Sequence, residues 1–534
     1  MIAYDAAGRV TAHWTAQGGA SGTLLNTWDA QSRRTKVEFS GTEILFGYNG
    51  DGQLDSLTDV NGDVSAMGYN ADLQAEEFGY PGGVNRRRFF KYPTTHRTAE
   101  VRWSMTPVDD AFGHLLTQDA MKRYTERAWV GVDTTRLYQY DAAGRLHSYQ
   151  DWELDSSSCT WDPDKGNLCP GGNALADSVN YSYDNVGNRT DHNATVETGN
   201  RLTSYDGYTL TWDDAGFLEQ KAKPGFTQDF YWNARGQLDS VSTNGTVSRY
   251  KYDGLGRRIE TDIDGVVRRY LHDGDDVFVE YDGSWNVVAE YTTWPGTDRL
   301  HSRRDSSGAV SYYAPDPQGT VLGLFAGGIT IQTRYWYDPW GMPEGTAVEN
   351  VENPFRYLGR PWDEVAGLLY LRARYYDPEI GRFISEDPIG LQGGINPYVY
   401  ASNDPINRTD RSGLTDECPE DEPSGDVDNP DTWWAELPEI CVEISQDDPG
   451  EGGGGPAPPD PNVERFQNRG PESVEARRLR SFYPGPRRSF TVGQALSTQI
   501  LRSLDPVPNC SVEGVLTGAV RVANRSALRV GIVG

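Results

Sequence analysis

Residues 212–259 read WDDAGFLEQKAKPGFTQDFYWNARGQLDSVSTNGTVSRYKYDGLGRRI, and one short motif returns in them every 20 residues. Each copy has an aromatic residue, Asp or Asn, two variable residues and Gly, and a second strand follows it. The Asp or Asn side chain bonds the turn backbone, while Gly accepts a positive φ. Before the third turn, Tyr250 and Tyr252 alternate with charged residues, as one face of a strand does. Each copy therefore predicts a β-hairpin.

The motif recurs far outside this stretch. Copies begin at Tyr4, Trp28, Tyr48, Tyr69, Tyr140, Tyr183, Trp212, Trp232, Tyr252, Tyr281 and Tyr337. A period of about 20 residues suits one hairpin and its connection, whereas a propeller blade needs about 40–50. We predict that residues 1–350 form a long antiparallel ribbon in which each hairpin pairs with the next.

The composition agrees with an all-β chain rich in turns and sets limits on function. The chain has 59 Gly, 30 Tyr and 15 Trp among 534 residues, with a hydrophobic share of 37%. Its five cysteines form no C-x-x-C pair, so we predict no disulfide framework, no zinc site and no cofactor. No long apolar run or signal peptide is present, which predicts no membrane span and no general secretory export. The net charge of −29 disfavours nucleic acid or an anionic membrane as a partner of the whole chain.

The charge divides the C-terminal part into two segments. Residues 415–462 hold 15 acidic and no basic residues, whereas residues 463–534 hold 11 Arg, no Lys and 5 acidic residues. We predict an extended acidic Gly/Pro linker followed by a small, variable, partly disordered basic tail. Two interpretations of the tail stay open: a toxin directed at nucleic acid, or an Arg-rich segment without that activity. All seven His lie at or before His301, so a His-based catalytic site in the tail is excluded.

Residues 355–414 differ from the repeats and contain four dense motifs. They are Arg-Tyr-Tyr-Asp-Pro at 374–378, Gly-Arg-Phe at 381–383, Asp-Pro-Ile-Gly-Leu at 387–391 and Asn-Pro-Tyr at 396–398. Together with the repeats, they resemble the Rhs/YD-repeat family with its C-terminal Rhs-repeat-associated core, a family of polymorphic-toxin shells. The resemblance implies a spiral β-sheet forming part of a hollow shell over residues 1–350 and a mixed core cap over residues 351–414. It also implies a variable passenger, commonly a toxin, after the cap.

In that family the shell cuts itself at the boundary with the passenger, and the residues that match can be named. Asp387 and Asp410 match carboxylates implicated in cleavage, Arg374 matches a required arginine, and the scissile bond corresponds to Leu414–Thr415. Two close carboxyls cannot both ionise, so they share a proton and can act as acid and base. The arginine would orient them or stabilise the developing oxyanion. The other interpretation is that both Asp residues only cap turns, as Asp-Pro and Asp-x-x-Gly commonly do.

One position departs from the family pattern. Arg411 stands where the family usually has proline. Because proline fixes φ near about −65°, we expect its loss to loosen the strand presented to the acids while leaving the acidic groups in place.

The surface area of the ribbon limits the size of the passenger that it can enclose. A sheet around a folded passenger of 120 residues must cover roughly 6,600 Å², and strands of this body cover about 4,000 Å². We therefore expect a shell that does not close, and a chain that is N-terminally incomplete relative to a longer repeat array.

These observations lead to one functional prediction and one rival. The first is a bacterial Rhs-repeat shell, exported by a specialised route or associated with the cell surface, that releases its passenger after Leu414. Its partners would be its own C-terminal passenger, an immunity protein and a secretion apparatus. The rival is a YD-repeat cell-surface or carbohydrate-binding structural protein that does not cleave itself and whose Tyr and Trp rings stack on sugars.

Overall fold

The computed structural model describes residues 2–416 except for short segments within that range. The segments left out are 18–19, 70–74, 82–85, 92–97, 105–109, 120–122, 131–133, 155–159, 163–165, 169–171 and 327–330. The described residues are almost entirely antiparallel strands, which confirms the all-β class. Beyond Asp416, the predicted linker and basic tail lie outside the described residues.

The first sheet has fifteen strands, each paired with its neighbours along the chain. They are β1 (Ile2–Tyr4), β2 (Val10–Gln17), β3 (Ala20–Trp28), β4 (Arg34–Phe39), β5 (Thr42–Tyr48), β6 (Leu54–Thr58), β7 (Val64–Tyr69), β8 (Ala75–Gly79), β9 (Arg86–Lys91), β10 (Thr98–Ser104), β11 (Asp110–Gln118), β12 (Tyr124–Val130), β13 (Thr134–Tyr140), β14 (Leu146–Leu154) and β17 (Gly172–Asn180). A separate hairpin lies between the last two, β15 (Thr160–Asp162) with β16 (Gly166–Leu168).

The second sheet has sixteen strands in unbroken chain order. They are β18 (Thr195–Glu197), β19 (Arg201–Tyr205), β20 (Tyr208–Trp212), β21 (Leu218–Lys223), β22 (Phe226–Trp232), β23 (Leu238–Thr243), β24 (Thr246–Tyr252), β25 (Arg258–Ile263), β26 (Val266–Asp273), β27 (Asp276–Asp282), β28 (Val287–Thr293), β29 (Leu300–Asp305), β30 (Val310–Pro315), β31 (Val321–Phe325), β32 (Ile331–Tyr337) and β33 (Pro343–Glu349). Among the described strands, the first and last of each sheet are paired on one side only, so both sheets are open.

In the part of the chain that the structure describes, the predicted single ribbon divides into two sheets between β17 and β18. The turn of the Tyr183 copy forms, but its pairing shrinks to a single bridge between Tyr183 and Arg189. The Asn188 side chain keeps its bond to Asp184 Oδ2 within the turn, at 2.9 Å, and adds two bonds outside it: it donates to Asn200 Oδ1 at 2.9 Å and accepts from Asn396 Nδ2 at 2.7 Å. Side-chain hydrogen bonds to other segments thus accompany the loss of strand pairing at this repeat.

The repeat turns form as their residue types predict. In the copy at Trp232, Asn233 Oδ1 accepts the N–H groups of Arg235 at 2.9 Å and Gln237 at 3.1 Å. Gly236 has a φ of +73°, and its N–H donates to the Asn233 carbonyl at 3.0 Å. A side chain with a Cβ is strained at such a φ, which explains the position of Gly in the motif.

In the copies at Trp232 and Tyr252, the aromatic residue links the hairpin to the preceding one. Trp232 Nε1 donates to the carbonyl of Leu218 at 2.8 Å, and the Tyr252 hydroxyl donates to the carbonyl of Leu238 at 2.7 Å. The motif arginine can add a second link, because the Arg33 guanidinium lies 4.5 Å from the centre of the Tyr48 ring in the next copy. The 20-residue period is therefore a contact period between successive hairpins.

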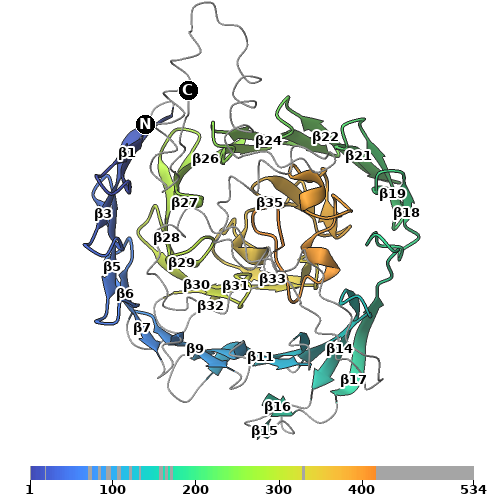
Figure 1. Ribbon diagram of the computed structural model, residues 1–534, viewed down its shortest axis with the longest axis horizontal. Coiled ribbons are helices and arrows are strands. Elements are labelled where there is room, and N and C mark those ends of the chain that lie inside the picture. The colour runs from blue at the N-terminus through green and yellow to red at the C-terminus, as the bar shows by residue number, and fades with distance from the viewer. Residues whose placement is uncertain are drawn as a thin grey trace, which may run out of the picture. The chain divides into compact units, whose positions relative to one another are not determined.

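The two sheets share one hydrophobic core. Leu57 and Met67 of the first sheet are buried in the same cluster as Phe278 and Tyr312 of the second. Strands β27–β30 accordingly lie beside β5–β7 in Figure 1.

Residues after β33 form a small four-stranded sheet that packs against both large sheets. Its strands are β34 (Trp362–Asp363), β35 (Leu368–Leu371), β36 (Arg374–Asp377) and β37 (Arg382–Phe383), and three short 3-10 helices accompany them, η2 (Tyr357–Gly359), η3 (Gly390–Gln392) and η4 (Ala401–Asn403). Leu371 joins a core with Leu146 of the first sheet, and Leu368 joins one with Leu218 of the second. We call residues 351–416 the cap (drawn mainly in orange in Figure 1). No helix among the described residues has the length and apolar character needed to cross a membrane.

Candidate functional site

The three side chains singled out in the sequence meet inside the cap. Arg374 begins β36 and is 3% exposed. Its Nη2 atom lies 3.1 Å from Asp387 Oδ2 and 3.0 Å from Asp410 Oδ2. One guanidinium nitrogen thus contacts both carboxylates, although the two acids stand far apart in the sequence.

Further contacts fix the Arg374 side chain in this place. Its Nε donates to the carbonyl of Gly413, its Nη1 donates to the carbonyl of Pro397 at 3.0 Å, and its guanidinium lies 3.5 Å from the centre of the Phe383 ring. Burial lowers the pKa of Arg374, and the charges of Asp410 and Asp387 oppose that effect.

Asp387 lies in a turn and points at the arginine. Its Oδ1 accepts the N–H of Ile389 at 2.9 Å, and its backbone carbonyl accepts the N–H of Gly390 at 2.9 Å. Burial raises the pKa of Asp387, Arg374 acts to lower it, and the charge of Asp410 adds to the rise. The side chain therefore caps its turn and also faces a second acid.

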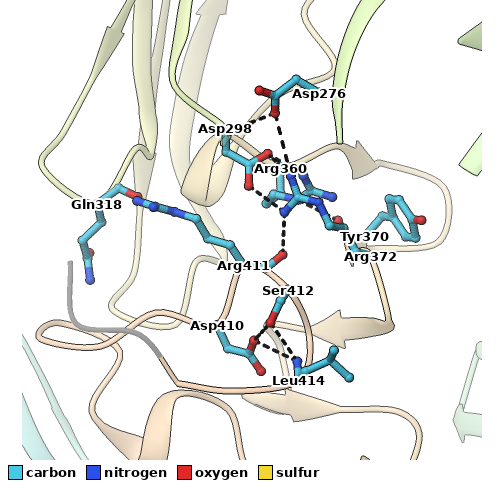
Figure 2. Close-up of polar contacts among 10 residues, drawn as sticks. All are labelled: Asp276, Asp298, Gln318, Arg360, Tyr370, Arg372, Asp410, Arg411, Ser412 and Leu414. Atoms are coloured by element: carbon cyan, nitrogen blue, oxygen red, sulfur yellow. Dashed lines mark hydrogen bonds and ion pairs between the residues drawn. The ribbon is translucent and has the colours of Figure 1, made fainter. Parts of the chain in front are cut away.

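Asp410 holds the backbone at the predicted scissile bond. Its Oδ1 accepts the N–H of Leu414 at 3.0 Å, the N–H of Thr415 at 3.3 Å and the hydroxyl of Ser412 at 3.1 Å; Figure 2 shows the contacts with Ser412 and Leu414. The side chain is only 1% exposed, and this burial raises its pKa despite the nearby Arg374. Asp410 therefore contacts the nitrogen that would leave if the Leu414–Thr415 bond broke.

Two glycines allow the chain to come this close. A Cβ on Gly393 would lie 2.2 Å from Asp387 Oδ2 and 3.4 Å from the carbonyl oxygen of Leu414, so that carboxylate and that carbonyl border the same small space. Gly413 has a φ of +68°, and a Cβ there would lie 2.4 Å from the carbonyl oxygen of Leu371. Neither glycine was among the predicted site residues; the signal for Gly393 was the Gly-Gly pair at 393–394, and the signal for Gly413 was the Asp-x-x-Gly sequence that begins at Asp410.

Arg411 is restrained by hydrogen bonds, although it lacks the fixed φ of a proline. The Arg411 guanidinium donates through Nη2 to the carbonyl of Gln318 at 2.8 Å, and the Arg411 carbonyl accepts from Arg372 Nη1 at 3.0 Å. Two tertiary hydrogen bonds thus restrain this residue where the family pattern uses a fixed φ (Figure 2). The expectation of a looser strand at Arg411 considered only the freedom of its backbone φ and not these two hydrogen bonds.

A third acid, absent from the sequence predictions, lies beside the site. Asp416 accepts a hydrogen bond from the hydroxyl of Ser402, and burial raises its pKa to about 6. The charge of Asp410 contributes to that rise. The site thus gathers three carboxyls and one arginine around residues 410–416, a composition suited to proton transfer.

The fold and the site define a class of protein: an open ribbon of aromatic-Asp hairpins that packs on a cap with a buried acid-arginine site. The family model described as Teneurin YD-shell matches residues 135–406, which is half of the chain. The chain belongs to this family.

Curated relatives confirm the resemblance to Rhs/YD proteins of the polymorphic-toxin group. The tRNA3(Ser)-specific nuclease WapA of Bacillus spizizenii is 34% identical over 148 residues, covering 25% of this chain and 6% of that protein. Toxin protein Tse5 of Pseudomonas aeruginosa is 54% identical over 61 residues, covering 11% of this chain and 5% of that protein. The Double-stranded DNA deaminase toxin A of Burkholderia cenocepacia is 36% identical over 109 residues, covering 20% of this chain and 8% of that protein. The matches therefore span only a small part of each of these relatives.

Solved structures with the same fold come from a toxin complex. A crystal structure of TcdB2-TccC3-Cdc42 aligns with a TM-score of 0.55 and 17% identity over 77% of this chain and 23% of that one. A TcdB2-TccC3 structure described as lacking the hypervariable C-terminal region aligns with a TM-score of 0.52 over the same share of each chain. At this identity the likeness establishes the fold, a shell-type β-ribbon.

Proposed function

We propose that this chain is a shell protein whose cap cuts its own backbone between Leu414 and Thr415 and so releases a variable C-terminal passenger. The proposal rests on one observation above the rest. Asp410 contacts the N–H groups on both sides of Leu414, while its carboxylate shares Arg374 with Asp387.

The contacts are consistent with acid-base hydrolysis of that amide bond. Asp387 borders the space next to the Leu414 carbonyl, so it is the base that would take a proton from an attacking water. The water oxygen bonds the carbonyl carbon, and the bond from this carbon to the Thr415 nitrogen breaks. Asp410, beside that nitrogen, is the acid that would protonate it as it leaves.

Arg374 would serve both carboxylates in this scheme. Its charge keeps one of the acids ionised, while burial and their mutual repulsion favour a proton on the other. Burial also strengthens every electrostatic contact in the site. The arrangement would thus supply one carboxylate as a base and one protonated carboxyl as an acid.

The passenger part of the proposal draws on the relatives. Three of them are named for toxic activities: a tRNA-specific nuclease, a toxin protein and a DNA deaminase toxin. One solved neighbour is described as TcdB2-TccC3 without its hypervariable C-terminal region. From these relatives we infer that this chain carries a passenger that begins at Thr415. An immunity protein, a secretion apparatus and specialised export stay predictions.

The rival, a sugar-binding surface protein that does not cleave itself, has less support from the described repeats. Ring faces that could stack on a sugar are packed against other rings: the centre of the Trp212 ring lies 4.9 Å from that of Tyr398, and the centre of the Trp232 ring lies 4.7 Å from that of Phe217. Rings committed to such contacts explain the aromatic content without a carbohydrate ligand.

The mass of the purified chain tests the proposal. We expect two products in place of the 59.3 kDa chain, one of them a fragment of about 13 kDa that begins at Thr415. N-terminal sequencing of the small fragment checks the bond. A single 59.3 kDa species that persists over days would refute self-cleavage and favour the rival.

A further inference from the structure

A cluster of buried ion pairs lies next to residues 410–415. This irregular segment contains the predicted scissile bond, and we call it the cleavage strand although it is not part of a sheet. At the centre of the cluster Asp298, in the turn between β28 and β29, is only 4% exposed in its side chain. Arg360 Nη1 donates to Asp298 Oδ1, and Arg372 donates to both oxygens of Asp298 at 2.8 Å. Figure 2 shows this cluster with the cleavage strand below it.

Arg372 extends the cluster to the cleavage strand. The same Nη1 atom that donates to Asp298 also donates to the carbonyl of Arg411 at 3.0 Å. Next to it, Ala373 donates its N–H to the carbonyl of Ser412 at 3.0 Å. Arg360 differs on this point: its Nε donates to the carbonyl of Tyr370 at 3.0 Å and not to the cleavage strand.

The backbone of Arg372 gives an independent sign that its side chain matters. Arg372 and Ala373 join β35 to β36, and Arg372 has a φ of +58°. That region favours glycine, and an arginine is strained there. Strain of this kind persists only where the surroundings hold the residue in place, and it gathers at functional sites.

The positive charges of Arg360 and Arg372 lie in direct contact with the negative charge of Asp298. Burial acts to raise the pKa of Asp298, but Arg360 and Arg372 outweigh it and hold that pKa below its usual value. Asp276 accepts the N–H of Asp298 at 2.9 Å and lies 3.8 Å from Arg372. Asp298 therefore stays ionised and anchors Arg372 from the side of the ribbon.

We propose that Arg372 is a positioning residue for self-cleavage: it fixes the Arg411 carbonyl, and with it the cleavage strand, to Asp298 of the ribbon. The inference rests on the proposed function for its effect on rate. It goes beyond that function, because it makes cleavage depend on docking of the β28–β29 turn against the cap. Arg411 adds a second ribbon anchor through the Gln318 carbonyl.

Three substitutions of Arg372 separate positioning from a purely structural role. R372G relieves the strained φ but removes the side chain, whereas R372L keeps the strain and removes the hydrogen bonds. R372K keeps the strain and retains one charged donor. If Arg372 serves only the turn, R372G should cut as fast as the parent chain. If it positions the strand, R372G and R372L should cut about a hundredfold more slowly, and R372K should recover part of the rate.

The experiment uses the full chain made in a cell-free reaction, with loss of the 59.3 kDa precursor followed over time. R360Q is the matched control, since it also removes a partner of Asp298 but leaves the bond to Arg411. We expect R360Q to cut within threefold of the parent rate in folded protein, as judged by near-ultraviolet circular dichroism. Equal slowing of R360Q and R372G, or no slowing of R372G, would overturn the proposal.

A second measurement does not depend on self-cleavage. In the D387N background the chain is expected to stay whole, and trypsin can cut after Arg411 only when the strand leaves its place. We expect R372G to speed that cut at least tenfold, measured by mass spectrometry of the Arg411–Ser412 bond. An unchanged tryptic rate would contradict the positioning role. A parent chain that never cuts itself, with tryptic protection that still depends on Arg372, would refute the proposed function alone.

Discussion

The same aspartate contact to the backbone occurs in the ribbon and in the cap, with opposite electrostatic results. Asp253 in the ribbon and Asp410 in the cap both begin an Asp-x-x-Gly sequence, and each accepts the N–H of the residue four positions later at 3.0 Å. Partial burial acts to raise the pKa of Asp253, but Arg257 outweighs it and the pKa lies below its usual value. Burial raises the pKa of Asp410 in spite of Arg374.

This contrast teaches that the turn supplies the geometry and the surroundings supply the chemistry. An Asp side chain that caps its own turn has a fixed direction whether or not it reacts. In the ribbon its outer oxygen meets an arginine of the same turn; in the cap it meets an arginine shared with a second acid. The two sequence-based interpretations of Asp387 and Asp410, turn cap and reactive acid, are therefore compatible.

The largest expected effect comes from removing a cap acid, with removal of the ribbon acid Asp253 as the comparison. D387N should slow self-cleavage at least about a hundredfold, because an amide cannot take a proton from water. D253N should cut at the parent rate, since Asn fills the same position in the Asn233 turn. The measurement is loss of the 59.3 kDa chain over time. Normal cleavage in D387N would remove the acid from the mechanism.

The next comparison is between Gly413 in the cap and Gly225 in the ribbon. In G413A the new Cβ would lie 2.4 Å from the Leu371 carbonyl oxygen, so the cleavage strand must move, and we expect at least tenfold slower cleavage. In G225A nothing lies within 4 Å, and only the strain of a φ of +80° remains, about 1 kcal/mol. Cleavage rates and urea unfolding of both variants check this. Equal effects would show that strain rather than crowding limits Gly413.

Asp338 allows a test of burial inside the repeat itself. It occupies the Asp position of the Tyr337 copy and accepts two backbone N–H groups, but burial raises its pKa to about 7. Because the unfolded value is about 3.9, the folded state holds this proton more tightly. The stabilising contribution is therefore complete below about pH 4 and lost as pH rises to about 7.

We accordingly expect D338N to gain stability relative to its parent between pH 5 and pH 8. The side chain is partly exposed, so water moderates the cost of ionisation and the gain should be roughly 1–3 kcal/mol. Thermal unfolding in the D387N background keeps all chains the same length. A difference between the two proteins that does not change with pH would refute the raised pKa.

The smallest expected effect concerns the link between hairpins. Y48F removes the hydroxyl that donates to the carbonyl of Arg34 at 3.0 Å but keeps the ring under Arg33. We expect a loss of about 1 kcal/mol in unfolding free energy and no change in cleavage rate. Urea unfolding measures the first and precursor loss the second. A large drop in cleavage would mean that the ribbon transmits more to the cap than its packing indicates.

Much of the fold and part of the site could be predicted because their signals are local. The 20-residue motif places its own Asp, Gly and aromatic residue, so hairpins and their order follow from the sequence. The cap motifs identified Arg374, Asp387 and Asp410 by resemblance. The break in the ribbon at Tyr183 could not be predicted from its motif, which is the same as in paired copies, whereas the bond from the cap residue Asn396 to Asn188 forms only in the folded chain.

The sequence by itself determined a repeating β-hairpin ribbon, a distinct cap and the residue types of a candidate acid site. Only the tertiary structure decided that one arginine lies between the two acids, that Asp410 holds the Leu414 and Thr415 amides, and that Asp298 reaches the cleavage strand through Arg372. The physical reason is the separation along the chain of the residues that interact. Turn hydrogen bonds span a few residues and are written in local order, whereas burial and ion pairing arise from segments that meet only when the chain has folded.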